Sequence, residues 1–294
     1  MKLKRNDLFI GIYILSAVLF FIISIPSWLL DILLAFNIMV ALVILFNSLF
    51  AKEVLDMASF PTMLLFTTIF RISLNVSSTK MILRDGYAGH VVSVFGQFVG
   101  GGNLVIGTII FIVLIIVQFI VINKGSERVS EVTARFTLDA MAGKQMAIDS
   151  DLNTGAITDK EAAERRKKLQ QENSFFGSMD GATKYVKGDA TAGLIITAIN
   201  LVGGIAMGML YNGMSINDAL STYSILTIGD GLCSQIPSLL ISLSTGILVT
   251  KASSEGELGD EMVGQLFSMD RVLIMVGAAL ILLGVGTPLP FYIF

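Results

Sequence analysis

Two aspartates stand near the predicted starts of apolar segments, where a carboxylate can take up and release a cation. Asp189 follows a glycine at the end of a polar stretch, and Asp230 lies between two glycines. At a membrane boundary, such a group could bind a proton or a metal cation and release it again. Aspartate is also a common helix N-cap, because its side-chain oxygen accepts free backbone N–H groups. Both interpretations stay open, and the two roles are compatible.

Three cationic side chains add to this pattern. Lys184 and Lys187 shortly precede Asp189 and would interact with its charge. Arg71 lies deep in an apolar segment, where a charge at mid-bilayer costs on the order of 3 kcal/mol on insertion scales. Arg71 should therefore face protein or water, with Asp31 or Asp230 as its partner. A functional ion pair and a purely structural one both remain possible.

Patterns of catalytic or metal-binding residues do not stand out. No phosphate-binding loop, zinc-protease motif or hydrolase nucleophile motif occurs, and the only histidine, His90, is expected to be a polar loop residue. The single Cys233 excludes an internal disulfide and a cysteine-based metal cluster. Residues 149–155 imitate a calcium loop, but Thr154 and Lys160 occupy the positions of its glycine and last glutamate. We expect no enzymatic activity, no cofactor and no metal.

The composition is that of an integral membrane protein. Hydrophobic residues make up 54% of the chain and charged residues 15%, with a mean hydropathy of +0.77. Soluble domains carry about 25% charged residues. Several apolar runs reach bilayer length, about 18 residues or more. No basic run with interleaved aromatic residues occurs, so we expect no binding to nucleic acid.

The apolar runs predict an all-α polytopic membrane protein with seven complete transmembrane helices and the start of an eighth. The expected spans are residues 8–25, 30–50, 60–83, 104–122, 190–210, 232–250 and 272–288, with the eighth beginning at 291–294. Residues 84–103 are glycine-rich and weakly hydrophobic, which indicates a loop or a re-entrant segment. The predicted domains are residues 1–122, 123–189 and 190–294. The incomplete eighth span indicates part of a longer protein.

The distribution of Lys and Arg predicts the orientation. Apart from Arg71, Lys80 and Arg84, these residues lie at the N-terminus, near residue 52, in 123–189 or in the loop that begins at residue 251. All four regions fall on one face of the predicted topology. The positive-inside rule makes that face cytoplasmic. The N-terminus and the loop 123–189 between spans four and five are therefore expected in the cytoplasm.

The loop 123–189 has the sequence signals of a small folded module of two helices. The first helix is expected from Ser126 to about Met141, with Gly143 ending it. The second is expected to start at Thr158, where Glu161 completes a capping box.

Charges of alternating sign occupy one face of the first predicted helix. Arg128, Arg135 and Asp139 carry this pattern together with Glu131. An apolar stripe lies beside it, formed by Val129, Val132 and Phe136. We expect the charged face to dock on a neighbouring subunit or another partner.

Several blocks of the chain resemble the FHIPEP family, the large export-gate proteins of flagellar and virulence type III secretion. The blocks are 71–80 (RISLNVSSTK), 131–141 (EVTARFTLDAM), 143–149, 176–182, 228–232 and 235–237. The resemblance covers essentially the whole chain and is closest to the flagellar branch, with a virulence (injectisome) paralogue as the alternative.

The resemblance implies an eight-span membrane domain in the bacterial cytoplasmic membrane, surrounded by lipid, and a large C-terminal domain that receives export substrates and chaperones. It also implies a ring of nine copies, contacts with other export-gate membrane proteins, and coupling to a proton or sodium gradient. Arg128, Arg135 and Asp139 match positions tied to export. Lys184, Asp189 and Asp230 match positions tied to ion coupling. Composition alone would favour a small-ion channel or secondary transporter, but such a carrier does not need the polar module.

Overall fold

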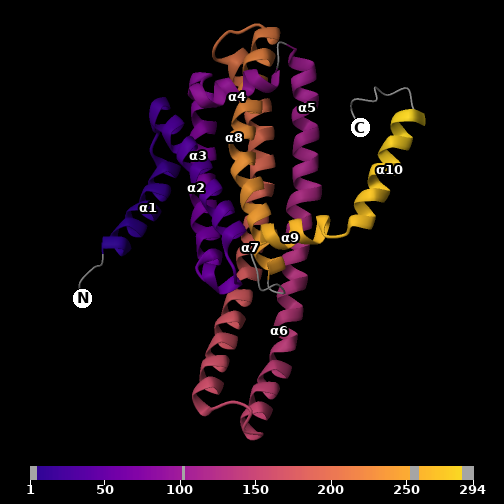
Figure 1. Cartoon of the computed structure of the whole chain (residues 1–294). Helices are drawn as coiled ribbons and strands as arrows, with labels where there is room; N and C mark the ends of the chain where they lie inside the picture. Colours follow the sequence, from indigo (N-terminus) through magenta and orange to yellow (C-terminus); the bar gives the residue numbers. More distant parts are fainter. Residues whose placement is uncertain (1–4, 101–102, 252–257, 287–294) are drawn as a thin grey trace.

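The structure is a computed structural model that describes residues 5–100, 103–251 and 258–286 (Figure 1). The described residues form helices and no strands, which confirms the all-α prediction. The elements are α1 (Arg5–Ile22), α2 (Ser27–Phe50), η1 (Val54–Met57), α3 (Phe60–Asp85), α4 (His90–Gly100), α5 (Leu104–Val117), η2 (Gln118–Asn123), α6 (Lys124–Asn153), α7 (Asp159–Leu210), α8 (Ile216–Thr250), α9 (Leu258–Phe267) and α10 (Asp270–Gly286).

Five helical segments of the described chain are long and apolar enough to cross a membrane: Ser27–Phe50, Val54–Asp85, Leu104–Asn153, Asp159–Leu210 and Ile216–Thr250. The predicted first and seventh spans correspond to α1 and α10, which are shorter. The count of seven complete spans therefore stays a prediction. The expected start of an eighth span, residues 291–294, lies outside the described residues.

The weakly hydrophobic residues 84–103 hold a short helix, α4, rather than a loop alone. This helix lies across the end of the bundle opposite the α6–α7 hairpin (Figure 1). The carboxylate of Asp31 accepts the backbone N–H groups of His90 and Val91, at 2.9 Å each. His90 is thus the first residue of a helix and not a loop residue, because a distant carboxylate on α2 satisfies the helix's free N–H groups.

Glycines bring α4 and α5 into direct contact with α8. A methyl group on Gly229 would lie 1.9 Å from the backbone oxygen of Val92, and one on Gly96 would lie 2.1 Å from the backbone oxygen of Ile225. A methyl group on Gly231 would collide with the ring of Phe111. The two glycines beside residue 230 therefore let α8 pack closely against α4 through Gly229 and against α5 through Gly231.

Two lysines cap the ends of other helices from within the bundle. Lys80 donates to the backbone oxygen of Phe21 in the last turn of α1. Lys251, only 2% exposed, donates to the oxygen of Leu49 at 3.0 Å and to that of Ala51, where α2 ends. A cation at a helix C-terminus satisfies free carbonyls and interacts favourably with the helix dipole.

The loop 123–189 forms the long α6–α7 hairpin that projects from the bundle (Figure 1). The predicted end at Gly143 is wrong, since α6 continues to Asn153. The predicted start at Thr158 is confirmed with its complete capping box. Hydrogen bonds from the Thr158 backbone N–H and hydroxyl hold the pKa of Glu161, on the polar part of the hairpin, below its ordinary value.

The second arm of the hairpin and the following apolar segment are one helix. α7 runs for 52 residues and crosses the predicted domain boundary at residue 189 without a break. At the base of the hairpin, Phe176 and Met179 are buried in one hydrophobic cluster with Met57 and Phe60. The ammonium of Lys168 also lies 2.7 Å from the carboxylate of Glu53. The hairpin is therefore anchored to the turn between α2 and α3.

We predict that Gly229→Ala lowers the stability of the protein, because backbone atoms of α4 leave no space for the added methyl group. Overpacking of this kind costs about 1–3 kcal/mol. Thermal unfolding of the detergent-purified protein measures the effect. Gly143→Ala is the matched control, since nothing lies within 4 Å of its added methyl group. The control should keep or raise the melting temperature, because Ala favours a helix by up to about 1 kcal/mol over Gly. Equal melting temperatures for the two variants would contradict the close contact.

Candidate functional site

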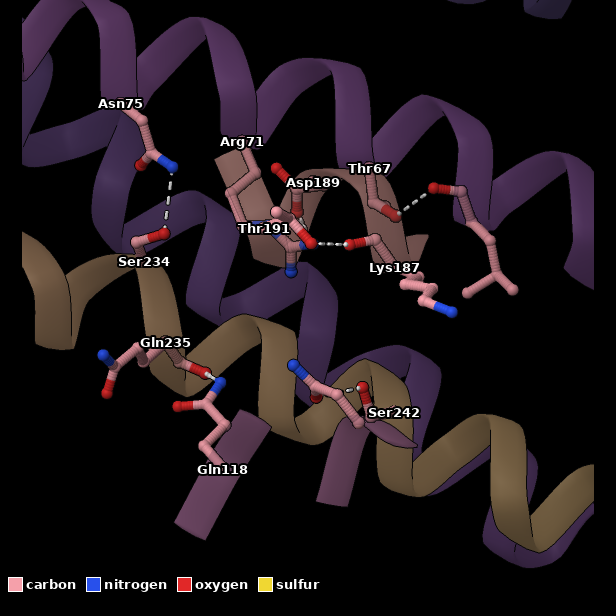
Figure 2. A network of polar contacts seen from close by, with 12 residues as sticks. Thr67, Arg71, Asn75, Gln118, Lys187, Asp189, Thr191, Ser234, Gln235 and Ser242 are labelled. Carbon is pink, nitrogen blue, oxygen red and sulfur yellow. Dashed lines mark hydrogen bonds and ion pairs between the residues drawn. The ribbon is translucent and has the colours of Figure 1, made fainter. Parts of the chain in front are cut away.

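A buried ion pair joins α3 to α7 in the middle of the bundle. Figure 2 shows Arg71 of α3 and Asp189 of α7 pointing toward one another. Their charged groups are in direct contact, with side chains 1% and 4% exposed. The partner of Arg71 is thus Asp189, and the predicted partners Asp31 and Asp230 are wrong. Asp31 instead caps α4.

A small, partly open cavity lies beside the ion pair and is lined by residues of α3, α5, η2, α7 and α8. Its volume is about 40 Å³, which is room for about three water molecules. Arg71, Asp189 and Asp230 are the charged side chains of its described lining. The structure therefore brings together the two predicted ion-coupling carboxylates and the intramembrane arginine.

The second carboxylate of the cavity has a neutral partner. Asp230, which is 4% exposed, accepts a hydrogen bond of 2.8 Å from the amide nitrogen of Asn200 on α7. Asp189 and Asp230 both lie inside long helices, so neither is the helix N-cap that the sequence suggested. In the sequence each carboxylate stands just before an apolar run, yet α7 begins at Asp159 and α8 at Ile216, well before these residues.

Neutral polar side chains complete the lining of the cavity (Figure 2). The amide of Asn75 on α3 donates to the hydroxyl of Ser234 on α8, at 2.9 Å. The amide of Gln118 donates to the backbone oxygen of Gln235, at 3.0 Å. Gln118 begins the π-helical segment η2, and such segments frequently mark functional sites. These bonds tie α3 and η2 to the same stretch of α8.

Sequence reasoning did not identify Asn200 and Gln118 as site residues. Each is an amide inside an apolar helix, and burying an amide is unfavourable unless it is hydrogen-bonded. The cost of burial therefore predicts that each amide has a hydrogen-bond partner, but it does not identify that partner.

The predicted charges of the hairpin occupy a separate site. Arg135, Asp139 and Lys184 line one open hollow of about 240 Å³ between α6 and α7. Lys184 pairs with Asp180 at 2.7 Å, and not with Asp189 as its sequence position suggests. Arg128 is exposed on the same helix, outside the lining of this hollow. The charges of the hairpin and the buried Arg71–Asp189 pair therefore belong to two separate sites.

The apolar stripe of α6 remains uncovered by the described chain. The side chains of Val129, Val132 and Phe136 are 40%, 41% and 69% exposed. The face that packs on α7 is a different one, where the hydroxyl of Ser130 lies 3.2 Å from that of Thr183. A wide apolar surface beside exposed charges is therefore available on the hairpin.

Comparisons with a family model and with known proteins all point to one family. The FHIPEP family matches residues 17–294. The flagellar biosynthesis protein FlhA of Bacillus subtilis is 53% identical over 287 residues, which cover 98% of this chain and 42% of the relative. FlhA of Salmonella typhimurium is 49% identical, covering 96% of this chain and 42% of the relative. Protein MxiA of Shigella flexneri is 46% identical, covering 99% and 42%. The chain thus spans less than half the length of these relatives, and no solved structure matches it.

We predict that Arg71→Leu impairs folding and membrane assembly, because it leaves the carboxylate of Asp189 buried without a partner. Breaking one side of a buried pair costs about 3–5 kcal/mol. Adding Asp189→Asn should restore the amount of folded protein in part. Asp31→Asn and Asp230→Asn are the controls and should restore nothing in the Arg71→Leu background. Size-exclusion chromatography and membrane protein levels measure the outcome. Rescue by either control in place of Asp189→Asn would refute the pairing.

Proposed function

Because this chain belongs to the FHIPEP family, we propose that it is the membrane part of an export gate of a flagellar type III secretion apparatus. The observation that carries the proposal is the identity of 53% to a flagellar biosynthesis protein across 98% of the chain. The long apolar helices fit a multi-pass protein of the bacterial inner membrane. In this proposal the chain is a transport component and not an enzyme.

In the proposed mechanism, an ion gradient drives protein export, and the ions act on the charged residues of the cavity. Asp189 and Asp230 supply carboxylates for a proton or a sodium ion, and Arg71 supplies a permanent positive charge beside them. The cavity lies where α7 meets α3 and α8, and α7 continues into the hairpin. A change of charge in the cavity therefore acts on the same helix that carries Lys184 and the hairpin surface.

The proposed partners are those that the family resemblance implies. The N-terminus and the hairpin face the cytoplasm, and lipid covers the outer apolar side chains of the bundle. Nine copies form a ring around the export channel and meet other export-gate membrane proteins. Arg128, Arg135 and Asp139, with the apolar stripe beside them, provide the contact between copies. Substrates and chaperones bind a C-terminal region corresponding to the part of the relatives that this chain does not match.

Two alternatives remain for the function. The identity of 46% to protein MxiA supports a second candidate, a virulence export gate of the same family. A small-ion channel or secondary transporter would fit the buried charges, but it does not explain an anchored hairpin with an exposed apolar stripe.

A chimera tests the proposal directly. This chain would replace the matched segment of the Bacillus subtilis protein in a strain that lacks that protein. Restored swimming and secretion of flagellar proteins would support the flagellar assignment. Secretion only when the chain is joined to the remainder of the Shigella protein would favour the virulence assignment. A chimera that assembles in the membrane yet exports nothing in either strain would contradict an export function.

We predict that Arg135→Ala reduces export in the active chimera while leaving the protein level unchanged. The guanidinium lies 3.8 Å from Glu131 and is 72% exposed, so loss of this pair changes stability by less than about 1 kcal/mol. A large loss of secretion would then report a lost contact with another subunit. Arg165→Ala is the control, because Arg165 forms an exposed pair with Asp151 outside the hollow. Normal secretion and normal ring assembly from Arg135→Ala would exclude docking through this face.

A further inference from the structure

We propose that α9 is an amphipathic helix that lies flat on the membrane surface at the hairpin side of the bundle. Its apolar face contacts lipid acyl chains, and its headgroup partner is neutral, zwitterionic lipid. The proposed placement holds whether or not the chain belongs to an export gate. It assigns a lipid contact to a segment that is too short to cross the membrane.

α9 (Leu258–Phe267) carries large apolar side chains that the described chain leaves uncovered. Val263, Leu266 and Phe267 are 58%, 62% and 60% exposed, and Met269, which follows the helix, is 63% exposed. Positions i, i+3 and i+4 share one face of a helix, so the first three side chains form a single apolar surface. A contiguous exposed apolar surface of this kind marks contact with a partner or a membrane.

The length and direction of α9 exclude a membrane-crossing helix. Its ten residues extend about 15 Å at 1.5 Å per residue, whereas the hydrocarbon core of a bilayer is about 30 Å thick. Figure 1 shows α9 running across the long axis of the bundle, whereas α5 and α8 run along that axis. A helix in this direction meets the bilayer along its side, as interfacial amphipathic helices do.

The neighbouring helices place the edge of the bilayer near the level of α9. Exposed apolar side chains continue along α2 to Phe50 and along η2 to Val121. The exposed Lys52 and Lys124 follow within three residues, and lysine is one of the residues that anchor helices at headgroup level. α9 contacts α2, and Figure 1 shows it near the level at which α5 passes into α6. The apolar face of α9 therefore lies where acyl chains meet the headgroups.

The connection to α10 fixes the direction of α9. Two residues, Ser268 and Met269, separate α9 from α10. The backbone oxygen of Met269 accepts the N–H groups of Val272 and Leu273, at 2.9 and 3.2 Å, and so holds the first turn of α10. Figure 1 shows α10 leaving the end of α9 at a steep angle. A turn this short leaves little freedom, so α9 lies across the start of the apolar helix α10.

The charges of this segment favour neutral headgroups over anionic ones. Residues 252–271 contain five acidic side chains and a single basic one, Arg271. The sequence of α9 itself contains Asp260 and Glu261 but neither lysine nor arginine. Interfacial helices that bind anionic lipids carry lysine and arginine on their polar face. An anionic surface therefore repels this segment, whereas a zwitterionic surface does not.

Tryptophan fluorescence in lipid vesicles tests the placement without an export assay. The chain has one tryptophan, Trp28, which Trp28→Phe removes. Phe267→Trp then puts a single indole on the apolar face, and folding should not change because this position is exposed. The protein would be reconstituted in phosphatidylcholine with bromine atoms either near the headgroup end of the acyl chains or near their methyl end. Bromine quenches the fluorescence of an indole that it touches. We expect the shallow bromines to remove most of the fluorescence of Phe267→Trp and the deep bromines to remove much less.

Two matched variants, also carrying Trp28→Phe, serve as controls. Phe136→Trp lies in the exposed stripe of the hairpin, at a position about as exposed as Phe267, and should keep its fluorescence in both kinds of vesicle. Ile112→Trp lies in the middle of α5 and should be quenched more by the deep bromines. Full fluorescence of Phe267→Trp in both kinds of vesicle would overturn the proposal. A long-wavelength emission maximum would then place the apolar face in water. A short-wavelength maximum would place it against protein, such as a second copy of the chain.

The headgroup preference has its own measurement. Replacing part of the phosphatidylcholine by phosphatidylglycerol should weaken the shallow quenching of Phe267→Trp. Potassium chloride should restore it, because salt screens the repulsion between exposed charges. Asp260→Asn combined with Glu261→Gln should remove much of this sensitivity, and Ile112→Trp should show none of it. Equal quenching of Phe267→Trp in neutral and anionic vesicles would refute the preference for neutral headgroups.

Discussion

The contact between Arg71 and Asp189 is the constraint on which the rest of the bundle depends. Each charge would be unfavourable alone in the apolar interior, and together they tolerate burial only in direct contact. Their meeting fixes how α7 lies along α3. The same contact also fixes which faces of α7 pack on α8 and on α6. A pair of this kind is weak as a source of stability and strong as a determinant of one arrangement.

The length of α7 gives that arrangement a consequence outside the bundle. A helix of 52 residues extends about 78 Å at 1.5 Å per residue. One part of it lies in the hairpin and the other carries Asn200, with Asp189 between them. Glu53 and the cluster around Phe176 hold the hairpin base against the turn after α2. The hairpin is therefore mechanically continuous with the helix that lines the cavity.

Sequence reasoning predicted the parts of this fold that depend on local chemistry. The capping box at Thr158 was identified because all of its hydrogen bonds lie within four residues. The end at Gly143 was wrong because the cost of a helical glycine, about 1 kcal/mol, is outweighed by packing of α6 on both sides of it, where Ala134 and Ile148 are buried.

The partners of buried polar groups could not be predicted in the same way. Several carboxylates could pair with Arg71 in different arrangements of the helices. Choosing among them requires knowing which helices are neighbours. Asp31 illustrates the difficulty, since its role as the cap of α4 joins residues about 60 positions apart in the chain. Charge and burial predict that a partner exists, and only the tertiary arrangement identifies it.

The two carboxylates of the cavity connect α7 to two different helices. The direct contact of Asp189 with Arg71 ties α7 to α3. About three helical turns further along α7, the hydrogen bond from Asn200 to Asp230 ties the same helix to α8. Residues separated by about three full turns project from the same side of a helix, so both contacts hold one side of α7 in the bundle. The remaining part of α7 lies in the hairpin, and its position therefore depends on the helix that these two buried contacts hold in place.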